Sequence, residues 1–156
     1  MDVGDSQEDS LRSRSTENPL LRSGLVFAGA NILRGGAEDG VLTALEAAGL
    51  DLLGTQLVVL SACETGVGAV KNGEGVFGLR RAFWLAGAKS MVMSLWKIND
   101  DATRDLMIEF YRNLTLGMAQ TDALRATQLK MLQSKKGRHP FYWASFIQIG
   151  EGAPLR

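Results

Sequence analysis

The chain is poor in the two residue types that most often build metal and redox sites, and it carries no net charge. It contains one histidine and one cysteine, and its 17 basic residues balance its 17 acidic residues. A single cysteine cannot form a disulfide within the chain, and a single histidine leaves no cluster of zinc ligands. A balanced charge creates no field that would draw the chain to nucleic acid or to an anionic membrane. We therefore expect no metal, no other cofactor and no nucleic-acid partner.

Long apolar runs are absent as well. No stretch approaches the roughly 18 consecutive apolar residues that a membrane-spanning helix needs. The N-terminus is polar, whereas a secretory signal peptide has a charged segment followed by an apolar one. The sequence therefore predicts a cytoplasmic protein that does not engage a membrane.

The composition changes near residue 19. Residues 1–18 are mainly charged residues, serine, threonine and asparagine. Burial of such residues cannot offset the entropy lost on ordering them, so a disordered tail is expected there. Residues 19–151 are long enough for a single domain, and residues 152–156 form a short tail.

Within this domain, apolar patterns predict strands that alternate with helices. Strands are expected over 25–28, 56–60, 89–96 and 142–150, and helices over 41–48, 75–86, 101–116 and 119–134. The unbroken apolar run at 56–60 is typical of a strand covered on both faces. Strands that alternate with helices imply βαβ units, and therefore an α/β fold whose parallel sheet lies between helix layers.

The single cysteine, Cys63, directly follows the predicted strand at 56–60, in the segment "LVVLSACETG". In parallel α/β sheets, reactive groups gather just past the carboxyl ends of strands. Backbone N–H groups would stabilise a thiolate there, and Gly66 and Gly68 would let a substrate backbone approach. Position alone nevertheless favours a buried structural cysteine, because free cysteine is among the most buried residue types.

Four longer segments resemble a known family. They are "ENPLLRSGLVFAGAN", "DGVLTALEAAGLDLLGTQLVVLSACETG", "GEGVFGLRRAFWLAGAKSMVMSLWKIND" and "HPFYWASFIQIGE", which together span residues 17–151. They resemble the CHAT domain, a caspase-like module of the cysteine-peptidase clan that contains caspases, metacaspases and separases. The resemblance implies a three-layer caspase-like sandwich with a mainly parallel central sheet. It also implies that Cys63 is a nucleophile that cleaves peptide bonds of a protein or peptide substrate through a thioester.

The general base that this family uses is not found in the sequence. Caspase-type chains carry a histidine about 50 residues before the cysteine, and no histidine precedes Cys63. By resemblance, we expect the fold to be N-terminally truncated and the isolated chain to be inactive. His139 lies in "RHPFYWA", which matches a non-catalytic part of the family, so we expect its ring to make a structural hydrogen bond at the entrance of the last strand.

Asp100 is the second candidate site residue. It resembles the acidic position by which separase-type relatives receive a basic side chain of the substrate. The alternative is that Asp100 is the N-cap carboxylate of the helix predicted at 101–116. Glu64 would raise the pKa of the thiol if the two side chains were close, so it is expected to face solvent or a basic residue. The stretch "GEGVFG" matches a phosphate-binding pattern only weakly, because it does not open directly after a strand.

Two other functions remain open. The chain could be a non-catalytic interaction module, or half of a split peptidase completed by a partner chain that supplies the histidine strand. Attached tetratricopeptide-repeat regions would be partners by resemblance. A sheet that lacks the histidine strand would expose unpaired backbone groups, which would also favour self-association.

Overall fold

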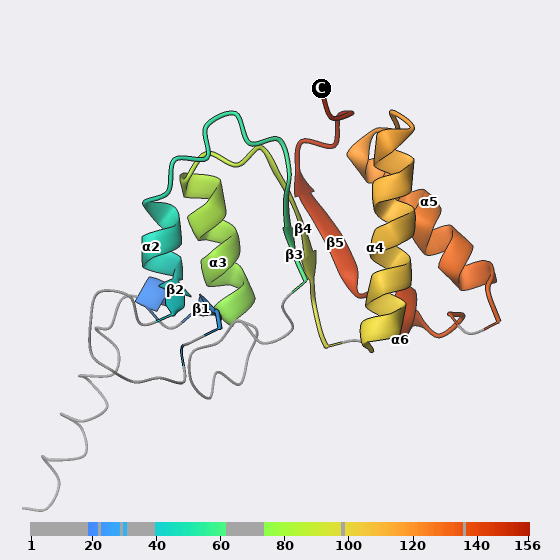
Figure 1. Ribbon diagram of the computed structural model, residues 1–156, viewed down its shortest axis with the longest axis horizontal. Coiled ribbons are helices and arrows are strands. Elements are labelled where there is room, and N and C mark those ends of the chain that lie inside the picture. Colours follow the sequence, from blue (N-terminus) through green and yellow to red (C-terminus); the bar gives the residue numbers. More distant parts are fainter. Residues whose placement is uncertain are drawn as a thin grey trace, which may run out of the picture.

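The computed structural model describes residues 19–21, 23–28, 30, 40–61, 74–97, 99–135 and 137–156. Figure 1 shows their arrangement. The predicted tail at 1–18, Cys63 and Glu64 lie outside the described residues. Asp100 and His139 lie within them.

The described part of the chain contains both strands and helices. In chain order they are η1 (Pro19–Leu21), β1 (Gly24–Val26), β2 (Val41–Thr43), α2 (Ala44–Ala48), β3 (Val58–Leu60), α3 (Glu74–Leu85), β4 (Ser90–Ser94), α4 (Asp100–Thr115), α5 (Gln120–Gln133), α6 (Pro140–Trp143) and β5 (Phe146–Gly150). Strands β1 and β2 form an antiparallel pair, and β3, β4 and β5 form a sheet in that order. The predicted α/β class is therefore confirmed.

The three-stranded sheet is mixed, so the expectation of a mainly parallel sheet is wrong for the described strands. β3 and β4 are parallel, with Val58 opposite Met91, whereas β4 and β5 are antiparallel, with Ser94 opposite Phe146. The connections explain the difference. A single helix, α3, carries the chain back to the start of the sheet, and the next strand runs parallel. The pair α4 and α5 carries the chain away and back again, so β5 starts where β4 ends (Figure 1).

Helices cover both faces of this sheet. Figure 1 shows α2 and α3 on one side and α4 and α5 on the other. All five residues of β4 are buried. Met91 and Met93 belong to the apolar cluster that includes residues of α2 and α3, and Val92 belongs to the cluster that includes residues of α4 and α5. Each large apolar side chain removed from water in this way contributes about 1.5–3 kcal/mol to stability.

The helix predicted over 41–48 is in fact a strand followed by a short helix. β2 covers Val41–Thr43, and α2 has only five residues. The change of structure occurs at Thr43, because its side chain accepts a hydrogen bond from the Glu46 N–H while the Glu46 carboxylate accepts one from the Thr43 N–H. This capping box begins the helix at Ala44. Alanine and leucine content alone could not locate that start.

The strand predicted over 142–150 is also shorter than expected. Its first residues belong to α6, which begins at Pro140, and β5 begins only at Phe146. Proline favours the first turn of a helix because its φ is fixed and it has no N–H to leave unpaired. The indole N–H of Trp96 donates to the Phe141 carbonyl oxygen at 2.9 Å, which holds this turn against the segment after β4.

The two long helices α4 and α5 pack through an apolar stripe that contains one polar pair. Leu106 and Phe110 of α4 are fully buried. Asn113 donates to the Thr127 hydroxyl at 3.1 Å, and that hydroxyl donates to the Ala123 carbonyl oxygen at 2.8 Å. The polar groups are thus satisfied inside the interface. Leu132 of α5 is 39% exposed and lies outside this stripe.

The last residues of the chain are attached to the start of the sheet. The Gln56 side-chain amide donates to the Arg156 carbonyl oxygen at 3.1 Å and accepts from the Arg156 N–H at 2.8 Å. Ala119 and Pro154 form an isolated antiparallel bridge. The predicted tail at 152–156 therefore has partners in two other segments.

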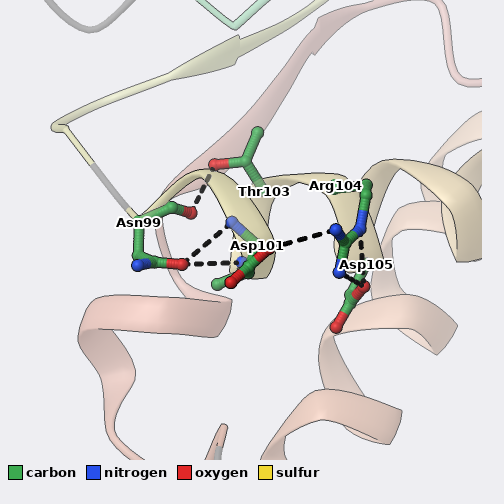
Figure 2. A network of polar contacts seen from close by, with 6 residues as sticks. Asn99, Asp101, Thr103, Arg104 and Asp105 are labelled. Carbon is green, nitrogen blue, oxygen red and sulfur yellow. Dashed lines mark hydrogen bonds and ion pairs between the residues drawn. The ribbon is translucent and has the colours of Figure 1, made fainter.

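The start of α4 is fixed by Asn99 (Figure 2). Its side-chain oxygen accepts hydrogen bonds from the N–H groups of Asp101, at 2.9 Å, and Ala102, at 3.3 Å. These two donors would otherwise lack partners in the first turn. Asn99 is the N-cap, and Asp100 is the first residue of the helix.

We predict that Asn99→Ala destabilises the protein by about 1 kcal/mol, because it removes the oxygen that caps α4. Urea denaturation measures the free energy of unfolding. Asn99→Asp, which keeps an acceptor at this position, should restore nearly all of the loss. Asp100→Asn should cost less than Asn99→Ala, because it removes only a favourable interaction with the helix dipole. A larger loss for Asp100→Asn would show that the carboxylate, not the amide, caps the helix.

Candidate functional site

The candidate site lies at the edge of the sheet where β3 and β4 both end. Because the two strands are parallel, their carboxyl ends meet at this edge. The start of β5 lies there too, since Phe146 is opposite Ser94. Three segments therefore converge, namely those that follow β3, follow β4 and precede β5. Open α/β sheets bind ligands at such edges.

The segment after β3 is described as far as Ser61, which is exposed. Cys63 follows shortly in the sequence and lies outside the described residues. Its predicted position past the end of β3 therefore stays a prediction. The described part of the chain supplies its basis, because β3 ends at Leu60 and belongs to the sheet between the helix layers.

The segment after β4 places Asp100 at the first position of α4, where it is exposed. The alternative interpretation of Asp100 as the N-cap carboxylate is wrong, because Asn99 fills that role. The neighbouring Arg104 pairs with other carboxylates, at 3.0 Å from Asp101 and 3.2 Å from Asp105 (Figure 2). Within the described ranges, no cation pairs with Asp100. Its carboxylate is therefore available to a cationic group of a ligand.

The segment before β5 contains His139, which caps α6. Its ring nitrogen Nδ1 accepts a hydrogen bond from the Phe141 N–H at 3.2 Å. The expected structural hydrogen bond is thus present. An Nδ1 that accepts carries no proton, so the neutral ring that fits this bond carries its proton on Nε2 and offers only a donor there. His139 could take a proton from a thiol through Nδ1 only if the cap were broken.

Direct contacts join the segment after β4 to the segment before β5. Trp96 stacks on Phe141, with ring centroids 6.4 Å apart, and its indole N–H donates to the carbonyl oxygen of the same residue. The Leu95 N–H donates to the Ser145 carbonyl oxygen at 2.8 Å. These bonds fix α6 beside the start of α4. Sequence patterns did not indicate this arrangement, because it depends on contacts between distant residues.

A groove of about 840 Å³ begins beside Asn99 and runs between α4, α5 and α6. Its lining includes Asp105, Ile108, Lys130 and Tyr142. The charges around it are largely paired, since Lys130 lies 2.7 Å from Glu109 and Arg104 contacts two aspartates. The sequence analysis did not find this groove, because residues from three helices line it.

In the part of the chain that the structure describes, no three side chains of His, Cys, Asp or Glu come together in a way that could hold a metal ion. No helix in those segments is both long and apolar enough to cross a membrane.

Comparison with known proteins identifies relatives. The family model described as CHAT domain matches residues 7–151. Tetratricopeptide repeat protein 28 of Homo sapiens is 36% identical over 120 residues, which is 76% of this chain and 5% of that protein. Tetratricopeptide repeat protein 28 of Mus musculus is 36% identical over 108 residues, which is 68% of this chain and 4% of that protein. The similarity to these relatives therefore covers most of this chain and a small part of each relative.

The family match begins before β1 and ends just after β5, so it includes every element that surrounds the candidate site. On this basis the chain belongs to the CHAT domain family.

Proposed function

We propose that this chain is the nucleophile-bearing part of a caspase-like cysteine peptidase domain, with Cys63 as the attacking thiol and Asp100 as the group that receives a basic side chain. Membership of the CHAT family carries this proposal. The parallel pair β3 and β4 supports it, because the segments that contain Cys63 and Asp100 leave the sheet at the same edge.

The chemistry of this proposal has two steps. The Cys63 thiolate attacks the carbonyl carbon of the substrate, and a thioester forms as the C–N bond breaks and the amine leaves with a proton. Water then hydrolyses the thioester and regenerates the thiol. A base must first take the thiol proton and deliver it to the leaving amine.

Asp100 suits the recognition of a basic side chain. Its carboxylate is exposed, has no cationic partner among the described residues, and lies at the end of the segment that follows β4. A lysine or arginine of a bound peptide would supply the missing counter-ion. An exposed ion pair of this kind contributes up to about 1 kcal/mol.

The base is the missing group. The chain contains one histidine, His139, and its Nδ1 already accepts a hydrogen bond from Phe141. We therefore infer that the 156-residue chain does not hydrolyse peptides by itself. A histidine supplied by another chain, or by another part of a longer protein, would complete the site.

A second candidate function is a non-catalytic interaction module. Among the described strands, β3 pairs only with β4, so its other edge has backbone groups to offer to a further strand. A partner strand that carries a histidine would complete a split peptidase, whereas a strand without one, or a second copy of the chain, would give an interaction module. The relatives are named for tetratricopeptide repeats, which supports repeat regions as partners.

We predict no hydrolysis by the isolated chain, because no imidazole is free to activate the thiol. The assay uses a mixed library of fluorogenic peptides with arginine or lysine at the cleavage position. The wild-type chain and Cys63→Ala should release fluorophore at the same background rate. Release by the wild-type chain that Cys63→Ala abolishes would contradict this proposal.

We also predict that Asp100 sets a preference for basic probes. Cys63 is the only cysteine, so mass spectrometry can follow its alkylation by peptidyl chloromethyl ketones that carry either arginine or glutamine. Asp100→Asn should reduce the preference for arginine by about fivefold, the equivalent of about 1 kcal/mol. Asp101→Asn is the matched control, because Asp101 already pairs with Arg104. An equal effect of the two substitutions would show that only the general negative charge of the helix matters.

A further inference from the structure

β5 forms one lateral edge of the sheet. The features of this lateral edge are separate from the candidate site, which lies at the carboxyl ends of β3 and β4. β5 is the last strand in the order β3, β4, β5. Its Ser145 and Glu151 flanks are bonded to the backbone of the segment around β4, through Leu95 and Lys89. In an antiparallel pair, the backbone N–H and C=O groups of successive residues point alternately toward the neighbouring strand and away from it. The backbone groups of Phe146 and Gln148 therefore point away from β4.

One of these outward groups is already satisfied. The Gln128 side chain donates to the Phe146 carbonyl oxygen at 2.9 Å. Within the described segments, the backbone N–H and carbonyl oxygen of Gln148 have no partner. An added strand could bond to both, because β-strands bind to sheet edges through such pairs.

A groove of about 480 Å³ lies beside this edge, between α3 and β5. Its lining consists of Phe77, Arg80, Arg81, Trp84, Ile149 and Gly150. Phe77 is 63% exposed and Trp84 is 53% exposed, although both are large aromatic residues. The Trp84 ring lies against the end of β5, because a side chain at Gly150 would approach its Cζ3 to 3.1 Å. The groove thus offers apolar area directly beside free backbone groups.

The charge of the groove is of one sign. Its lining contains two arginines and no carboxylate. The Arg80 guanidinium lies over the Phe77 ring, 5.7 Å from the centroid. Among the described residues, neither arginine has an acidic partner. A ligand that fits the groove should therefore carry acidic as well as apolar side chains.

We infer that β5 and α3 form a docking site for an extended acidic peptide, which adds to β5 at Gln148 and places alternate side chains in the groove. An apolar side chain would contact Trp84 and Ile149, and acidic side chains on the same face of the peptide would pair with Arg80 and Arg81. The site lies on the other edge of the sheet from β3, so it does not depend on the proposed peptidase chemistry.

The test uses the full chain and a fluorescein-labelled heptapeptide, TETLTET, whose glutamates and leucine share one face when extended. Fluorescence anisotropy measures its dissociation constant. We expect saturable binding that weakens as salt is added. The peptide TKTLTKT and the double variant Arg80→Glu with Arg81→Glu should each weaken binding by about tenfold or more. Arg125→Glu, on the exposed surface of α5, should leave binding unchanged.

Backbone methylation tests the strand geometry without any change to the protein. Only alternate amides of an added strand face β5. One peptide is methylated on the backbone amides of the central threonines, and the other on those of the leucine and the glutamates. The affinities of these two peptides should therefore differ by about tenfold or more.

Three results would overturn this inference. They are equal binding of the two methylated peptides, equal binding of TKTLTKT, and no saturable binding of TETLTET up to about 1 mM. Dimerisation of the chain that is lost in the double arginine variant, with no peptide binding, would assign the edge to a second copy instead.

Discussion

The burial of β4 organises the sheet and both of its helix layers. All five of its residues are buried, and its side chains alternate between two apolar clusters. Met91 and Met93 pack toward α2 and α3, and Val92 packs toward α4 and α5. Both helix layers and both neighbouring strands are thus positioned relative to this one strand. The two ends of β4 mark the two ends of the sheet, where the connecting segments meet.

The direction of the neighbours of β4 decides which groups meet at each end. One helix separates β3 from β4, so their carboxyl ends coincide. A pair of long helices separates β4 from β5, so β5 starts at that same edge. As a result α6 and His139 lie beside the start of α4. The His139 imidazole lies at the end of the sheet that carries the candidate site. Its Nδ1, however, accepts the hydrogen bond that caps α6.

The sequence predicts the elements whose apolar pattern is long and regular. The helices α3, α4 and α5 and the strand β4 occur within a few residues of the expected ranges. A stripe of buried residues determines each helix, and burial on both faces determines β4. Short elements are missed where a single polar contact decides the structure. Thr43 and Glu46 begin α2 inside a segment that reads as one helix, and His139 and Pro140 begin α6 inside a segment that reads as one strand.

The candidate site shows the same contrast between features that apolar patterns predict and features that single polar contacts decide. The position of Asp100 directly after β4 follows from the strand pattern. Composition could not decide between Asn99 and Asp100 as the cap of α4, because both side chains can accept the same hydrogen bonds. The antiparallel direction of β5 also lay beyond sequence patterns, although it determines what surrounds the site. The proposed role of Cys63 as the nucleophile rests on the resemblance and on the family match.

We infer that this chain contributes Cys63 and Asp100 to a caspase-like site, whereas its one imidazole caps α6. Nitrogen-15 NMR of the His139 ring tests it most directly, with Cys63→Ser as the comparison. We expect an unprotonated Nδ1 and a protonated Nε2 in the neutral ring, with ring shifts that are the same in the wild-type chain and in Cys63→Ser. A change in the ring nitrogens on replacement of the thiol would contradict the claim, because it would show that His139 and Cys63 interact.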